Sequence, residues 1–192
     1  MVRSAASLIR TRGVNATSFS EVLEDSGAPR GSIYHHFPQG KEQLTEDAIR
    51  WTSEGVLEHQ RACKATTPAG VVSHFIKPWH EAVVSSHGAA GCPVAGVAVD
   101  TLPEARELMA LVKGAFASWI DLLATQLEAT GLKDDRARGV ALATLAAVEG
   151  ALILCRAERN ALPLETVAVE LKRLVDTGRR PVRSKTGRGP RI

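Results

Sequence analysis

Hydrogen-bond donors and cations gather in one short segment near the amino end of the chain, residues 26–41. The segment holds Arg30, His35, His36 and Lys41 and contains no acidic residue. An arginine can donate two parallel hydrogen bonds to the edge of a guanine, or it can bind a phosphate. A short helix that presents such donors outward suits the major groove of duplex DNA. The alternative is that this segment is an ordinary solvated surface with no binding role.

A first helix is expected just before this segment. Ser18 and Glu21 have the spacing of a capping box, in which each side chain satisfies the backbone amide of the other residue. Phe19 and Val22 are spaced for one buried face. Gly27 can adopt the left-handed conformation that ends a helix. We therefore predict a short helix that starts after Ser18 and stops at Gly27.

A second helix would then carry the donors. Pro29 suits its first turn, because proline has no amide proton to leave unsatisfied there. Ile33 and Phe37 are four residues apart and can pin this helix to the first one. The remaining faces hold Arg30, Gly31, Ser32, Tyr34, His35 and His36. This arrangement predicts a helix-turn-helix.

Composition and patterning favour an all-α fold. Hydrophobic residues make up 44% of the 192 residues and charged residues 23%, as in an ordinary soluble protein. Runs that alternate apolar and polar residues are almost absent. Apolar spacing instead predicts helices at residues 1–12, 41–64, 68–86, 136–158 and 163–177, and a long helix behind a second capping box at Thr101 and Glu104.

The net charge of +3 is unevenly distributed. Residues 178–192 carry six basic residues and no acid, so removing them leaves 18 basic against 21 acidic residues, a net charge of −3. Total charge therefore does not identify a DNA-binding protein, and local placement must. We expect this tail, rich in Arg, Gly, Pro and Ser, to be disordered.

Targeting and redox features point to the cytoplasm. The chain shows no signal peptide and no stretch of about 18 uncharged apolar residues, as a membrane span needs. Its three cysteines are odd in number and far apart. We therefore expect no disulfide framework and no membrane partner.

The segment APRGSIYHHFPQGKEQL resembles the recognition helix and following turn of the TetR family of transcriptional regulators. The residues that carry the resemblance are Arg30, Gly31, Ser32, Ile33, Tyr34, Phe37, Lys41, Glu42 and Leu44. Residues 38–41 (PQGK) and 91–93 (GCP) resemble the LmrA/YxaF-type branch. The resemblance implies a DNA-binding domain at residues 1–45, a ligand-binding and dimerisation domain at 46–177, and a basic tail at 178–192.

The resemblance also implies a function. It indicates a ligand-responsive repressor that leaves a palindromic double-stranded DNA operator when a small apolar effector binds, with no cofactor. Lys41 opens the next helix, where its amine and the free backbone amides can bind an anion. The expected DNA contacts are Thr17, Ser18, Arg30, Gly31, Ser32, Tyr34, His35, His36 and Lys41.

Aromatic residues from two predicted helices could line an effector pocket. Phe75 and Trp79 share one helix face, and Phe116 and Trp119 share another. Without the resemblance these residues would be interpreted as plain core, and with it both readings remain open. Cys92 and Met109 are further candidates at the edge of the set.

One helix suggests a dimer. Between Val140 and Cys155 only Glu149 is charged, and apolar residues occur on every side. Such a helix must be covered all round. We predict a homodimer through helices 136–158 and 163–177, packed as a four-helix bundle. The alternative is the central core helix of a monomer.

Two other classes of function remain as alternatives. The chain could be an α-helical enzyme or small-molecule carrier with a vestigial helix-turn-helix, although no catalytic signature stands out. It could also bind nucleic acid nonspecifically through its basic tail. The histidines lack metal-binding spacing, so we predict no metal site.

Overall fold

The computed structural model describes residues 1–102 and 104–176, and within those ranges the chain is helical with no strand. The predicted tail at 178–192 lies outside the described residues. The helices are α1 (Val2–Arg12), α2 (Phe19–Ser26), α3 (Ser32–His36), α4 (Lys41–Arg61), α5 (Pro68–Ser85), α6 (Pro93–Asp100), α7 (Arg106–Ala129), α8 (Asp134–Glu158) and α9 (Leu162–Asp176). The all-α prediction is confirmed.

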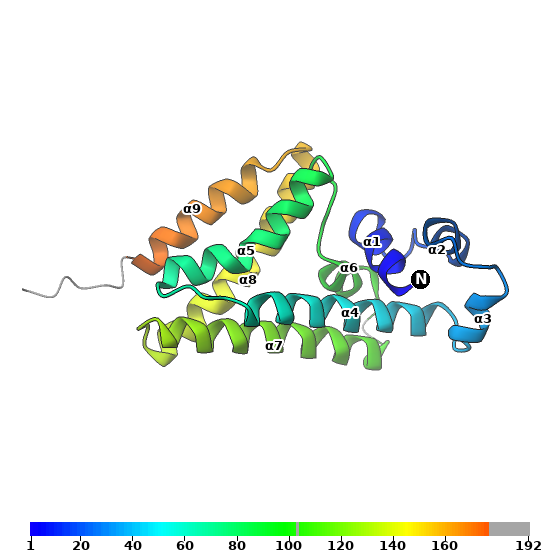
Figure 1. Ribbon diagram of the computed structural model, residues 1–192, viewed down its shortest axis with the longest axis horizontal. Helices are drawn as coiled ribbons and strands as arrows, with labels where there is room; N and C mark the ends of the chain where they lie inside the picture. The colour runs from blue at the N-terminus through cyan, green and yellow to red at the C-terminus, as the bar shows by residue number, and fades with distance from the viewer. Residues whose placement is uncertain (103, 177–192) are drawn as a thin grey trace, which may run out of the picture.

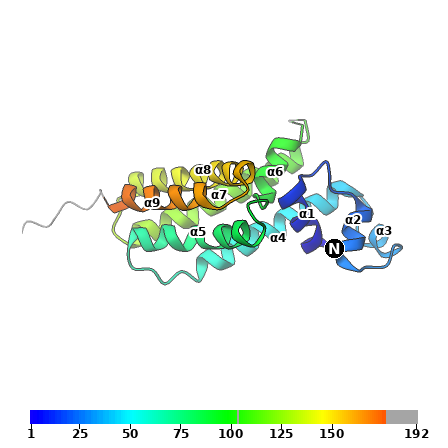
Figure 2. The ribbon, with the colours of Figure 1, turned by 90° about the horizontal axis from the view of Figure 1, so that it is seen from above.

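The helices form a small amino-terminal unit and a longer body. Helices α1, α2 and α3 lie together at one end of the molecule (Figure 1). Helix α4 leaves that end and runs along α7, while α8 and α9 lie side by side in the body and α5 packs against α9 (Figures 1 and 2). Because α4 is one continuous helix from residue 41 to residue 61, it connects the two units rigidly.

Side-chain capping marks the starts of α2, α5 and α6. The Thr67 hydroxyl accepts a hydrogen bond from the Gly70 amide, and Pro68 occupies the first turn of α5. The capping box predicted at Thr101 and Glu104 is wrong. Thr101 instead ends α6, with its N–H donating to the Val97 carbonyl at 3.1 Å, and α7 begins only at Arg106.

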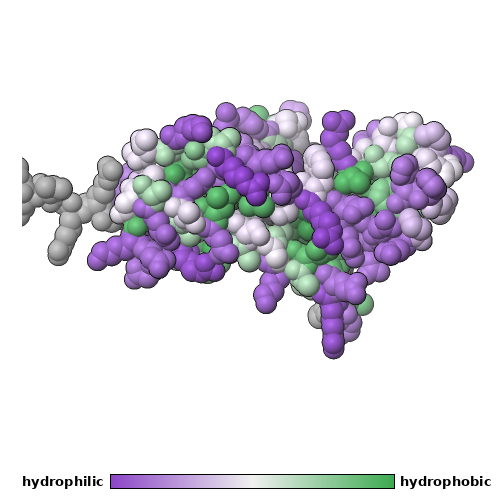
Figure 3. Space-filling view, turned by 60° about the horizontal axis from the view of Figure 1, so that its bottom comes forward, coloured by the Kyte–Doolittle hydropathy of each residue, from purple (hydrophilic) through white to green (hydrophobic). Residues whose placement is uncertain are grey.

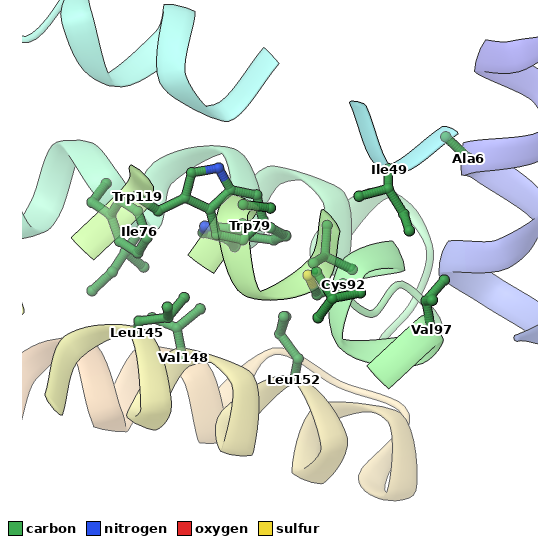
Figure 4. Close-up of a cluster of buried hydrophobic side chains, with 14 of the residues drawn as sticks. Ala6, Ile49, Ile76, Trp79, Cys92, Val97, Trp119, Leu145, Val148 and Leu152 are labelled. Carbon is green, nitrogen blue, oxygen red and sulfur yellow. The ribbon is translucent and has the colours of Figure 1, made fainter. Parts of the chain in front are cut away.

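One continuous core joins the two units. Figure 4 shows Trp79 and Trp119 beside each other in the body, with Cys92, Ile49 and Val97 nearer the amino-terminal unit and Ala6 on that unit itself. All of these side chains are buried. The contacts mean that α1 and α4 share packing with the α6–α8 body instead of hanging from it by a linker.

A reciprocal histidine pair joins α4 to α5. Pro78 has no amide proton, so the carbonyl of His74, four residues earlier, lacks its helical donor. The Nε2 atom of His59 lies 2.9 Å from that carbonyl oxygen, and the Nε2 atom of His74 lies 2.8 Å from the His59 carbonyl oxygen. The two rings stack with centroids 4.1 Å apart. Since a carbonyl only accepts, both Nε2 atoms carry the proton.

Helix α8 has two different faces. Val140, Val148 and Leu152 are buried, whereas Leu142 and Leu154 are more than half exposed. Figure 3 shows apolar surface over the body on the face drawn, while the end that carries the helix-turn-helix is mostly hydrophilic. Both α7 and α8 are long and apolar enough to cross a membrane by length and composition alone, a test that the core helix of a soluble protein also passes.

Glu149 is the one charged side chain in the apolar part of α8 and is largely buried. Burial raises its pKa to about 7, and a hydrogen bond with the Cys92 thiol opposes that rise. Its Oε1 atom has no hydrogen-bond partner in the described structure. The ionised form is therefore unfavourable in the folded protein.

We predict that His59→Phe, which keeps a stacking ring but removes the donor, lowers the free energy of unfolding by about 1–2 kcal/mol, because the His74 carbonyl is left unpaired. The cost should shrink in a Pro78→Ala background, where residue 78 regains an N–H for that carbonyl. Urea unfolding of the four proteins measures both values. An equal cost in the two backgrounds would contradict this account.

We also predict a pH dependence from Glu149. Its pKa is raised in the folded state, so the folded protein holds a proton that the unfolded chain releases near pH 4.5. This contribution to stability is full below about pH 4.5 and is lost as the pH rises to about 7, on the order of 2–3 kcal/mol. Unfolding curves of Glu149→Gln should lack that loss, while the exposed control Glu158→Gln should retain it.

Candidate nucleic-acid interface and ligand cavity

The predicted capping box forms the start of α2. The Ser18 hydroxyl accepts from the Glu21 amide at 3.3 Å, and Glu21 Oε2 accepts from the Ser18 amide at 2.8 Å. The hydrogen bond from the Ser18 amide, and after it one from the Ser18 hydroxyl to Oε2 at 2.9 Å, lowers the pKa of Glu21. Arg12 at the end of α1 adds an ion pair to Glu21 at 2.7 Å. Gly27 ends α2 in the left-handed conformation, as predicted.

Helix α3 starts later than the sequence indicated. Pro29 lies in the turn before the helix and not in its first turn. Its carbonyl oxygen accepts the hydrogen bonds of the first helical residue, Ser32. The Ser32 amide donates to this oxygen at 3.0 Å and the Ser32 hydroxyl donates to it at 2.7 Å. The helix itself spans only Ser32–His36.

Packing beneath α3 fixes which residues face outward. Ile33 and Phe37 are buried, as their spacing predicted. Tyr34 is 71% exposed, and its ring meets the Phe19 ring edge-to-face at a centroid distance of 5.9 Å. Arg30 and Tyr34 border the same groove between α2 and α3. Tyr34 is therefore held by packing and still open to solvent, and Arg30, in the turn before α3, is exposed.

The other residues predicted to contact DNA lie in different environments. Gly31, His35, His36 and Lys41 are exposed, and Lys41 Nζ also lies 3.5 Å from the Asn15 carbonyl oxygen. Thr17 is buried, and its hydroxyl donates to the Gly13 carbonyl at 2.8 Å. The Thr17 side chain is thus engaged in structure, while the other eight predicted residues lie at or near the surface.

Sequence reasoning missed a residue that positions the turn between α3 and α4. The Gln43 side chain accepts from the Gln39 amide at 3.1 Å and donates to the His36 carbonyl at 3.3 Å. An amide side chain in the first turn of a helix can bond back to preceding backbone groups, and this was the available signal. Gln43 thereby fixes the end of α3 relative to α4.

Two hydrogen bonds attach α1 to α6. The Gly91 amide donates to the Arg10 carbonyl at 2.9 Å, and the Val14 amide donates to Asp100 Oδ2 at 2.9 Å. Gly13 has a φ of 84°, and a Cβ atom there would lie 2.6 Å from Asp100 Oδ2. Only glycine fits this close approach. The helix-turn-helix is therefore bound to α6 of the body.

Comparisons with known proteins agree with this architecture. Residues 2–48 match the family model of bacterial regulatory proteins of the tetR family, and residues 68–170 match that of the transcriptional regulator LmrA/YxaF-like C-terminal domain. An uncharacterized HTH-type transcriptional regulator of Mycobacterium tuberculosis is 39% identical over 180 residues, which cover 91% of this chain and 92% of the relative.

The chain belongs to the TetR family.

Two solved TetR-family structures show the same fold. A regulator from Legionella pneumophila has a TM-score of 0.79 at 23% identity, covering 91% of this chain and 94% of that one. A cysteine mutant of the regulator CifR, complexed with 26 bp double-strand operator DNA, has a TM-score of 0.72 at 16% identity, covering 91% and 93%. At these identities the likeness shows the fold alone.

Membership of the TetR family decides between the broad classes of function. The relatives are transcriptional regulators and not enzymes, so the chain is a DNA-binding transcriptional regulator. The alternative of an enzyme or carrier with a vestigial helix-turn-helix is not favoured. TetR regulators are soluble, which explains α7 and α8 as helices of a soluble body.

The predicted ligand-binding residues of this TetR regulator do not share one cavity. Phe75, Trp79 and Trp119 are buried, and the two tryptophan rings pack with centroids 5.9 Å apart. Phe116 packs edge-to-face on Trp119, and Met109 is half-buried on the same helix. Trp79 borders a cavity of about 140 Å³. Cys92 borders a second cavity of about 330 Å³ between α1, α6 and α8, and Arg10 lines both cavities.

Proposed function

We propose that this TetR-family regulator is a cytoplasmic repressor that binds a palindromic operator as a two-fold dimer and releases it when a small molecule binds. The observation that supports this DNA-binding surface is that the α3 segment has one buried face and one exposed face. Ile33 and Phe37 are buried beneath it, and Arg30 and Tyr34 remain exposed above. A helix held by one face and open on the other can enter a major groove without unfolding.

Charge supports the same surface. No acidic residue lies between residues 26 and 41, although the body of the protein is slightly acidic. Arg30 offers a fork of donors to a guanine edge or a phosphate, and the exposed Tyr34 hydroxyl suits a phosphate. His35, His36 and Lys41 extend the donor set. We assign Ser18, Gly31 and Ser32 to its edge and exclude the buried Thr17 side chain.

An operator complex of a protein with this fold adds support. The CifR structure was solved with double-strand operator DNA, and its chain superposes on most of the present one. Binding of duplex DNA is therefore compatible with this arrangement of helices.

The exposed face of α8 supports the dimer. Leu142 and Leu154 are 55% and 52% exposed, and small residues at 143, 146 and 150 lie between them. On α9, Leu162 and Val169 are also exposed. An apolar groove of about 480 Å³ runs between the two helices beside Ala147 and Leu171. Helices α8 and α9 of a second copy would cover this surface and present two equal α3 helices to DNA.

Release by an effector follows from the attachment of α1 to α6. A ligand that prefers a body conformation with displaced α6 would move α1, and with it the helix-turn-helix, through the Arg10–Gly91 and Val14–Asp100 hydrogen bonds. The population would shift away from the state in which both α3 helices fit the operator.

We predict that Arg30→Ala and Tyr34→Ala each weaken operator binding about 10- to 100-fold, since each removes a contact to a base or a phosphate. The operator can be selected from random duplexes with the wild-type protein, and affinities can then be measured by fluorescence anisotropy. Arg61→Ala, an exposed arginine at the far end of α4, is the matched control and should bind as wild type does. Wild-type affinity in both α3 variants would show that the interface is elsewhere.

We predict that Leu154→Glu converts the dimer into a monomer, because a carboxylate would be buried without a partner at the interface. Sedimentation velocity at micromolar concentration measures the change. Val84→Glu, at an equally exposed apolar residue on α5, is the control and should remain dimeric. A dimer that persists in Leu154→Glu would place the interface on another face.

A further inference from the structure

The cavity at the junction of the DNA-binding unit and the body has the properties of a ligand site. It holds about 330 Å³ between α1, α6 and α8, within the size range of small-molecule pockets, and it is partly open to solvent beside the exposed residues Val99 and Ile153. Its walls are largely apolar and include Ile9, Ala95 and Leu152. Its lining also includes the half-buried side chains of Glu149 and Arg10.

Each of these two side chains has a buried polar atom without a partner. Neither Glu149 Oε1 nor Arg10 Nε makes a hydrogen bond in the described structure. Burial lowers the pKa of Arg10, and the pKa of Glu149 is raised to about 7 by the same cause. The Cys92 thiol hydrogen-bonds to Glu149 and lines the same cavity as Glu149 and Arg10. A buried polar atom that lacks a partner is costly, and a bound molecule can supply one once the side chain turns to bring that atom, now inaccessible to solvent, to the cavity wall.

The remaining charges of the cavity are engaged elsewhere or lie at its rim. Arg12 forms an ion pair with Glu21, and Asp100 accepts the Val14 amide. Arg156 is exposed. A cation in the cavity would be attracted by Glu149 but repelled by Arg10. An anion would be attracted by Arg10 but repelled by Glu149. An uncharged hydroxyl can donate to one group and accept from the other without either conflict.

We propose that this junction cavity binds an uncharged small molecule that has an apolar body and a hydroxyl group, with the hydroxyl directed at Glu149 and Arg10. The proposal rests on the proposed function in one respect, namely that the bound molecule acts as the effector. The Gly91–Arg10 and Val14–Asp100 hydrogen bonds join the helices that wall the cavity, α1 and α6. A molecule wedged between them acts directly on the attachment of the DNA-binding unit.

A matched series of probes tests the chemical class. Cyclohexylmethanol, cyclohexylmethylamine and cyclohexanecarboxylate share one ring and differ in charge. In titrations followed by ¹H–¹⁵N NMR, cyclohexylmethanol should shift the amides of Gly91, Gly96 and Val14 and should bind at least tenfold more tightly than either ion. Tighter binding of an ion, shifts confined to other residues, or no binding of cyclohexylmethanol would each overturn the proposal.

Variants test the location. Ala95→Leu fills the cavity and Glu149→Leu removes its acceptor, so each should weaken cyclohexylmethanol binding at least tenfold. Phe116→Leu, in the aromatic cluster of the body, is the control and should bind the probe as wild type does. If folded Ala95→Leu binds cyclohexylmethanol as wild type does, the cavity is not the binding site. If that variant does not fold, the amide shifts of the wild-type protein show whether the probe binds in the cavity.

Operator binding separates this proposal from the proposed function. If the wild-type protein binds its selected operator and cyclohexylmethanol does not bind the protein, the cavity assignment fails and the regulator stands. If the probe binds the cavity but changes operator affinity less than twofold, the ligand site stands and its regulatory role fails.

Discussion

The burial of Ile33 and Phe37 is the constraint on which the DNA-binding surface depends. These two buried side chains anchor a five-residue helix to the protein core, and a helix this short would not persist alone in water. Their packing directs Arg30 and Tyr34 to solvent, while the Ser18–Glu21 capping box and the Gln43 side chain fix the elements on either side. The backbone that carries the donors is thereby preorganised, which reduces the conformational entropy lost on binding.

Packing and hydrogen bonds also fix the DNA-binding unit to the body. Helix α4 is continuous across the boundary, the His59–His74 pair attaches it to α5, and two hydrogen bonds attach α1 to α6. Displacement of α6 or α5 is therefore transmitted through packed helices and not through a flexible linker. The cavity beside Cys92 lies at this attachment, and the unpaired Glu149 Oε1 and Arg10 Nε atoms belong to two of the residues that line it.

Features encoded by local chemistry could be predicted from the sequence. The Ser18–Glu21 capping box, the Gly27 end of α2, the Thr67 cap of α5 and the buried pair Ile33 and Phe37 are all read from spacing. Features decided by tertiary packing could not. Thr101 matched a helix start but ends α6, Pro29 lies ahead of α3, and Trp79 packs on Trp119 away from the larger cavity. The reciprocal His59–His74 bonds join residues 15 apart, which no local pattern reveals.

A crystal structure of the protein bound to its selected operator duplex tests the central claim most directly. The account predicts α3 of each protomer in successive major grooves, with Arg30 and Tyr34 within hydrogen-bonding distance of bases or phosphates while Ile33 and Phe37 stay buried. A complex in which α3 faces away from the duplex, and another surface contacts it, would contradict the account.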